Sequence, residues 1–114
     1  IMLAYTFSIL ADSFGPVPYY SFGNNDAEFQ ALDLQNFPNP TYASQQKIYT
    51  DILNELKAAS NQLILSDNNL AGDKIYGGDM LKWKKFANSL RLRVANRVKV
   101  ASPAAQAHMT GDDF

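Results

Sequence analysis

The sequence contains no cysteine, so neither a disulfide nor thiolate chemistry is available to its 114 residues. Its single histidine, His108, has no partner residues at the spacing that metal sites and catalytic triads require. No glycine-rich phosphate loop follows a predicted strand. We therefore predict no catalytic residue, no metal site and no cofactor, and we expect that the chain is not an enzyme.

Long apolar runs are also missing, and none approaches the roughly 20 residues that span a bilayer. The net charge of -1 lacks the basic excess of a nucleic-acid binder. Seven of the ten basic residues do lie between Lys82 and Lys99. On a helix they fall on different faces, so we predict no nucleic-acid partner and expect the arginine stems to cover a core edge. The expected pairs join Arg91, Arg93 or Arg97 to Asp12, Asp51 or Glu55.

Apolar residues recur at helical spacing in three stretches, which predicts helices over residues 3–13, 44–65 and 79–100. In the first stretch two apolar faces predict burial on most sides. Trp83 lies within the stripe of the third, which favours core packing over a role as a sugar platform. Pro103 ends the third stretch, and a fourth helix is expected to begin at Ala104. Helices joined by ordinary loops predict an all-α fold with antiparallel helical packing.

A long irregular loop, residues 19–43, follows the first predicted helix, and loops of this length in compact domains are usually functional. Its first part places aromatic rings beside amides: Tyr19, Tyr20, Phe22, Asn24 and Asn25. Rings stack on the C–H faces of a sugar while amides pair with its hydroxyls, so these five are the candidate ligand-binding residues. Anchoring of the loop to the core is the alternative role for the rings.

Three blocks carry a family resemblance: Asp12-Ser13-Phe14-Gly15-Pro16-Val17-Pro18-Tyr19, then Tyr42-Ala43-Ser44-Gln45-Gln46-Lys47-Ile48-Tyr49, then Tyr76-Gly77-Gly78-Asp79 with Lys82-Trp83-Lys84-Lys85-Phe86-Ala87-Asn88-Ser89-Leu90-Arg91-Leu92-Arg93. In order and spacing they resemble the SusD-like family (the SusD/RagB superfamily) of outer-membrane nutrient-binding lipoproteins. Pro16 stands where that family often carries Asp. The Tyr20-Ser21-Phe22 stretch departs from its usual Ser-Glu-Ala continuation, so ligand contacts in this loop do not carry over.

The resemblance implies a helical scaffold with TPR-like helix pairs and a non-catalytic role in binding glycan or another nutrient. It implies a surface-exposed lipoprotein on the outer membrane of a Bacteroidetes-type bacterium, with its lipid anchor outside this chain. The implied partner is a SusC-like TonB-dependent transporter, over which such proteins sit as a lid. Residues 1–114 are then expected to be part of a single larger helical domain, truncated at both ends.

A helical protein-interaction module without a small-molecule ligand is the competing interpretation. The full-length sequence would discriminate, because a signal peptide with a cysteine at its cleavage point favours the lipoprotein.

Overall fold

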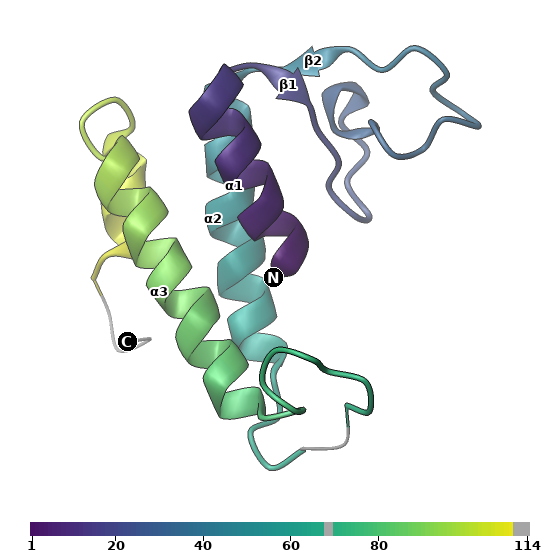
Figure 1. Ribbon diagram of the computed structural model, residues 1–114. Helices are drawn as coiled ribbons and strands as arrows, with labels where there is room; N and C mark the ends of the chain where they lie inside the picture. The colour runs from purple at the N-terminus through teal and green to yellow at the C-terminus, as the bar shows by residue number, and fades with distance from the viewer. Residues whose placement is uncertain (68–69, 111–114) are drawn as a thin grey trace. The chain divides into compact units, whose positions relative to one another are not determined.

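The computed structural model describes residues 1–67 and 70–110 (Figure 1). Its elements are α1 (Met2–Phe14), β1 (Val17–Pro18), the 3-10 helix η1 (Ala27–Phe29), β2 (Tyr42–Ala43), α2 (Gln45–Gln62), α3 (Met80–Val98) and the 3-10 helix η2 (Pro103–His108). The chain divides into two compact units, Met2–Ile52 and a second that begins at Leu53. The predicted all-α fold is confirmed, and the TPR-like pairing stays a prediction.

Helix α1 buries one face only. Its buried residues, Ala4, Phe7, Ser8 and Ala11, recur at helical spacing and are mostly small. The larger apolar side chains, including Leu3, Ile9 and Phe14, are exposed. The prediction of burial on most sides was therefore wrong, because the small residues form the packed face.

A short antiparallel pair of strands, missing from the prediction, closes the connection between α1 and α2. Gly15, at a φ of 73°, ends α1 and donates its N–H to Ala11 O at 2.9 Å. The chain then extends through β1, which pairs with β2 in the register Val17 with Ala43. Residues 19–41 therefore form a connection that begins and ends at this strand pair.

The start of α2 is fixed to the end of α1 within the first unit. Ser44 caps α2 by accepting the N–H of Lys47 at 3.3 Å. Gln45 Nε2 donates to Ala11 O at 2.9 Å, and the Tyr49 hydroxyl donates to Asp12 Oδ1 at 2.5 Å. These contacts set where the first turns of α2 lie relative to the last turn of α1.

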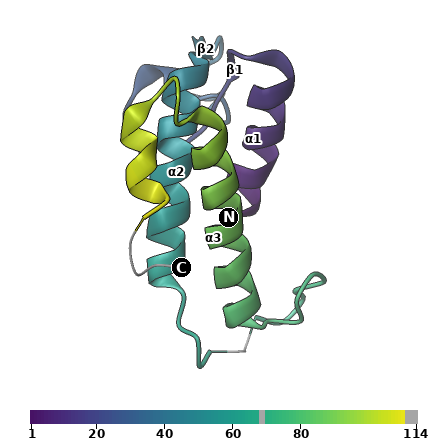
Figure 2. The ribbon, with the colours of Figure 1, turned by 90° about the vertical axis from the view of Figure 1, so that its left-hand side faces the viewer.

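In the second unit, the latter half of α2 and α3 run in opposite directions (Figures 1 and 2). Asp79 caps α3 by accepting the N–H of Lys82, and the apolar stripe of α3 is buried at Ala87, Leu90, Val94 and Ala95. Helix α2 ends at Gln62, three residues before the predicted end, where the apolar side chains Ile64 and Leu65 become exposed. The expected fourth helix is the 3-10 helix η2, with Pro103 at its start.

Candidate functional site

The irregular connection of the first unit is ordered by backbone pairing at its base. Tyr20 forms an isolated antiparallel bridge with Gln30. Beside it, the N–H of Ser21 donates to Phe29 O at 3.2 Å, and the N–H of Ala31 donates to Tyr19 O at 3.0 Å. Residues 19–31 therefore form a closed arm, and the ligand-binding candidates all lie in its first half, residues 19–25.

Tyr19 is the anchor of this arm. Its side chain is 2% exposed, between Phe7 at a ring-centroid distance of 4.8 Å and Phe29 at 5.0 Å, both in edge-to-face geometry. Its hydroxyl donates to Asp51 Oδ2 at 2.5 Å. A ring enclosed in this way has no free face, so the expectation that Tyr19 offers a stacking surface was wrong. The alternative role of loop anchoring describes it.

Phe22 has the opposite environment, because its side chain is 83% exposed. It lies on a tight turn in which the N–H of Asn24 donates to Ser21 O at 3.2 Å. Gly23 occupies the third turn position with a φ of 73°, a conformation that favours glycine. The turn thus holds Phe22 outward, while Tyr20, one step before Ser21, is half-buried.

The two amide candidates are used differently. Asn24 Oδ1 accepts the N–H of Asp26 at 2.9 Å, so this oxygen is committed to the local fold. Asn25 is exposed, and no hydrogen bond of its side chain is found within residues 1–67 and 70–110. Asn25 therefore keeps its full donor and acceptor capacity for a ligand, and Asn24 keeps mainly its amide nitrogen.

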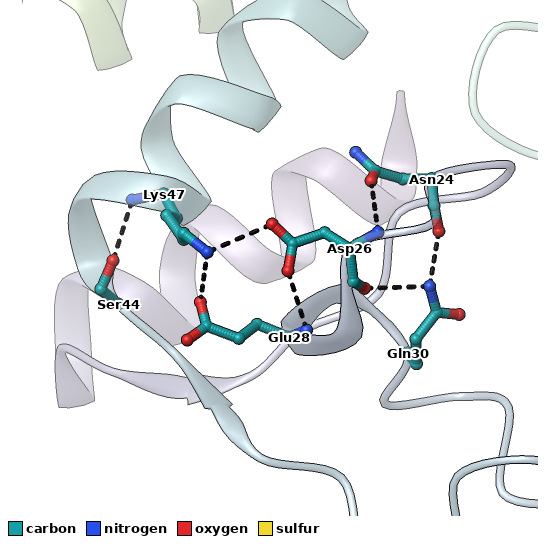
Figure 3. Close-up of polar contacts among 6 residues, drawn as sticks. All are labelled: Asn24, Asp26, Glu28, Gln30, Ser44 and Lys47. Carbon is teal, nitrogen blue, oxygen red and sulfur yellow. Dashed lines mark hydrogen bonds and ion pairs between the residues drawn. The ribbon is translucent and has the colours of Figure 1, made fainter.

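A polar network orders the chain after these amides (Figure 3). Asp26 Oδ1 accepts the N–H of Glu28 at 3.0 Å and so caps η1. Gln30 Nε2 donates to Asn24 O at 2.5 Å and to Asp26 O at 3.0 Å. The side chain of Gln30 thereby fixes the backbone at Asn24 and Asp26.

Lys47 ties this network to α2 (Figure 3). Its Nζ lies 3.2 Å from Asp26 Oδ2 and 2.8 Å from Glu28 Oε2. The backbone N–H of Glu28, and then the Lys47 ammonium, lower the pKa of Asp26. The bonds to Glu28 and then to Asp26 raise the pKa of Lys47. Asp26 and Lys47 are therefore both charged at neutral pH.

Sequence reasoning missed this cluster of Asp26, Glu28, Gln30 and Lys47. One signal was present: Lys47 stands at the third position of α2, where a capping box requires Glu or Gln. A cation there, with no acidic residue in the first turn, indicates that carboxylates from elsewhere compensate it.

The basic helix α3 carries a buried cation in the second unit. Arg91 is 1% exposed, and its Nε donates to His108 Nδ1 at 3.2 Å, which requires a neutral imidazole. Desolvation, then the charges of Arg91 and Lys57, lower the pKa of His108. Arg93 and Arg97 are exposed. The expected pairing of these arginines with Asp12, Asp51 or Glu55 stays a prediction.

Trp83 lies half-buried in the first turn of α3, and its side chain contacts the connection that precedes this helix. Its indole Nε1 donates to Asp73 Oδ2 at 2.7 Å, and its ring meets Tyr76 edge-on at 5.0 Å. Asp73 also accepts the N–H groups of Ile75, Tyr76 and Gly78. Desolvation raises the pKa of Asp73, but the bonds from Trp83 and these N–H groups outweigh it and lower the pKa to about 2. All four acceptor positions of this carboxylate are used, so Asp73 is a structural group.

Two further findings concern only residues 1–67 and 70–110. They contain no group of three or more His, Cys, Asp or Glu side chains that could hold a metal ion. None of their helices combines the length and the apolar character needed to cross a membrane.

Comparison with known proteins places the chain in a family. Searches of curated proteins and of solved structures gave no significant match. A SusD-like family model, described as "Starch-binding associating with outer membrane", matches residues 1–111. The chain therefore belongs to the SusD-like family, whose members are non-catalytic proteins that bind starch or other glycans in association with the outer membrane.

Proposed function

We propose that this chain is part of the glycan- and nutrient-binding component of a TonB-dependent outer-membrane uptake system. Membership of a family described as starch-binding and outer-membrane-associated supports this proposal. The partner would be a SusC-like transporter, over which the protein acts as a lid. The protein would be a surface-exposed lipoprotein of a Bacteroidetes-type bacterium, with these residues forming part of a larger helical domain and the lipid anchor outside them.

The observation that carries the site is the exposure of Phe22 on an ordered turn. A ligand that covers the face of a large apolar ring removes that surface from water, which favours binding. Asn25, three residues further along, supplies amide groups for hydroxyls, and Tyr20 supplies a second, half-buried ring. We therefore place the glycan contacts on Tyr20, Phe22, Asn24 and Asn25, without Tyr19.

The exposure of these residues limits the affinity. Sugar hydroxyls exchange hydrogen bonds with water for hydrogen bonds with protein, so each bond contributes little net free energy. A shallow site of this kind is expected to bind with a dissociation constant in the micromolar to millimolar range, or roughly 4–8 kcal/mol.

The experiment is isothermal titration of the full-length protein with maltoheptaose, a starch-derived oligosaccharide. Phe22→Ala should weaken binding at least about fivefold, because truncating a contact residue of this kind costs more than about 1 kcal/mol. Phe14→Ala is the matched control: it removes another exposed phenylalanine, at the end of α1 and outside the arm. Equal affinity in the two variants would reject the arm as the glycan site.

A second candidate function is a protein-interaction module without a small-molecule ligand. The same connection exposes the apolar side chains of Leu32, Leu34 and Tyr42, which favours contact with another protein. A module of this kind would give no heat with maltoheptaose even in the unmodified protein, whereas the glycan-binding protein would.

A further inference from the structure

We infer that Lys47 is a positioning residue for the proposed glycan-binding arm. Its ammonium holds Asp26 and Glu28, and through them fixes the turn that carries Phe22. This inference rests on the proposed function, because it concerns the same arm.

The local chemistry of α2 supports a role for Lys47 outside the helix. The first turn of a helix favours negative charge, since its free N–H groups form the positive end of the helix dipole. Lys47 places a cation there, and the first turn contains no acidic residue. The carboxylates of Asp26 and Glu28, at 3.2 and 2.8 Å from Nζ, supply the missing negative charge from the arm. A residue that opposes its own helix while satisfying another segment indicates a constraint imposed by that segment.

Hydrogen bonds connect Lys47 to the turn that carries Phe22, and Figure 3 shows them as far as Asn24. Asp26 binds Lys47 through Oδ2 and caps η1 through Oδ1, so one carboxylate joins α2 to the arm. The N–H of Asp26 then donates to Asn24 Oδ1, and the N–H of Asn24 closes the turn at Ser21. Phe22 occupies the position after Ser21 in that turn. Asp26, the direct partner of Lys47, is therefore one hydrogen bond away from Asn24, the last residue of the turn.

The exposure of the three charged side chains determines how much their ion pairs are expected to stabilise the arm. The side chain of Lys47 is 47% exposed, and those of Asp26 and Glu28 are 34% and 36% exposed. Ion pairs in such positions contribute modestly and are screened by salt. An ordered arm nevertheless raises affinity in proportion to the population of the binding-competent state.

The test uses three variants of the full-length protein and amide hydrogen exchange as the readout. Lys47→Met removes the charge and keeps an apolar stem, and should speed exchange in residues 22–30 about threefold. Lys47→Glu should speed it about tenfold, because it repels both carboxylates. Lys85→Met is the matched control: Lys85 is exposed on α3 and has no ion pair in the described part of the chain, so the arm should be unaffected.

Lys47→Glu also separates positioning from general stability. With Ser44 as the cap, a glutamate at the third helical position completes a capping box and stabilises the first turn of α2. Exchange should therefore become faster in residues 22–30 and no faster at the start of α2. Unchanged exchange in the arm, or equal acceleration in the arm and the helix, would overturn the inference.

Titration with maltoheptaose completes the test. Lys47→Glu should weaken binding about as much as it lowers the ordered population of the arm, and added salt, at about 0.5 M, should reduce the difference from the unmodified protein. If Phe22→Ala weakens binding and Lys47→Glu leaves it unchanged, the proposed function stands and the positioning role fails. If Phe22→Ala has no effect, the arm is rejected as the glycan site, and the positioning role in glycan binding fails with it.

Discussion

The connection between β1 and β2 and the connection that precedes α3 are both irregular, and one carboxylate organises each. In the first, Asp26 caps η1 and binds Lys47, which lies 21 residues further along the chain. In the second, Asp73 takes all its hydrogen bonds from within ten residues, the most distant being from the indole of Trp83. The first connection is thus tied to α2 over 21 residues, and the second is tied to the first turn of α3 over ten residues.

The environments of the aromatic rings differ in the same way. Phe22 extends from the first connection into solvent, whereas Tyr76 of the second meets Trp83, in the first turn of α3, edge-on, and both rings are half-buried. A ring that packs within its own segment stabilises that segment, and a ring held in water is available to a ligand. The comparison teaches that the arm of residues 19–31 presents a surface, while residues 73–83 form a structural joint.

The largest effect is expected where the presenting arm is anchored. Tyr19→Ala removes a buried ring with two edge-to-face partners and should lower the free energy of unfolding by about 3–5 kcal/mol. Tyr19→Phe removes only the hydroxyl bound to Asp51 and should cost about 1–2 kcal/mol. Urea denaturation measures both. A cost under about 0.5 kcal/mol for Tyr19→Ala would show that the ring is not an anchor.

The structural joint should lose its order when the carboxylate of Asp73 is replaced. Each oxygen of Asp73 accepts two N–H groups, and the N–H of Gly78 shares Oδ2 with the indole N–H of Trp83. Asp73→Asn replaces one of these oxygens by an amide donor that faces two N–H groups, and should disorder residues 73–79. The indole N–H resonance of Trp83 should shift toward its solvent-exposed position. Asp79→Asn is the control, since the amide oxygen still caps α3. An unshifted indole resonance in Asp73→Asn would contradict the joint.

The lowered pKa of Asp73 predicts that the stability of the joint depends on pH. The pKa of Asp73 is lowered from 3.8 to about 2, so its ionised form is favoured by the fold. Its contribution to stability is therefore complete above pH 3.8 and is lost as the pH falls through about 2. In Asp73→Asn this part of the acid response of the Trp83 resonance should disappear.

The smallest effect concerns the two glycines that bend the connections. Gly23 and Gly77 have φ values of 73° and 62°, and alanine at either position should cost about 1–2 kcal/mol. The difference between the regions lies in function: Gly23→Ala should also weaken maltoheptaose binding by disturbing the turn under Phe22, and Gly77→Ala should not. Equal weakening by both variants would remove the distinction between presenting arm and joint.

The helices could be predicted because their stripes are local. Ile48, Ile52 and Leu56 recur at helical spacing and are fully buried, and Ser44 marks the start of their helix. The three sequence blocks likewise indicate the SusD-like family by their residues and spacing alone, and the family match over residues 1–111 confirms it.

The arm could be predicted only as an irregular segment with candidate rings. Whether a ring is buried depends on distant partners: Tyr19 meets Phe7, Phe29 and Asp51, and no period links these positions. The pairing of Val17 with Ala43 is equally non-local, as is the ion pair of Lys47 with Asp26. The sequence therefore places Phe22 and Asn25 together in an irregular segment, where both are exposed, without showing that Tyr19 belongs to the core.

The most direct test of the account is amide hydrogen exchange of the full-length protein with and without saturating maltoheptaose. Binding at the arm predicts slower exchange in residues 20–30 and unchanged exchange in residues 73–79, because Phe22 in the arm is exposed to a ligand whereas Tyr76 is half-buried. Protection of residues 73–79 alone, or of neither segment while the protein binds the oligosaccharide, would contradict the claim that this arm is the glycan-binding part of the chain.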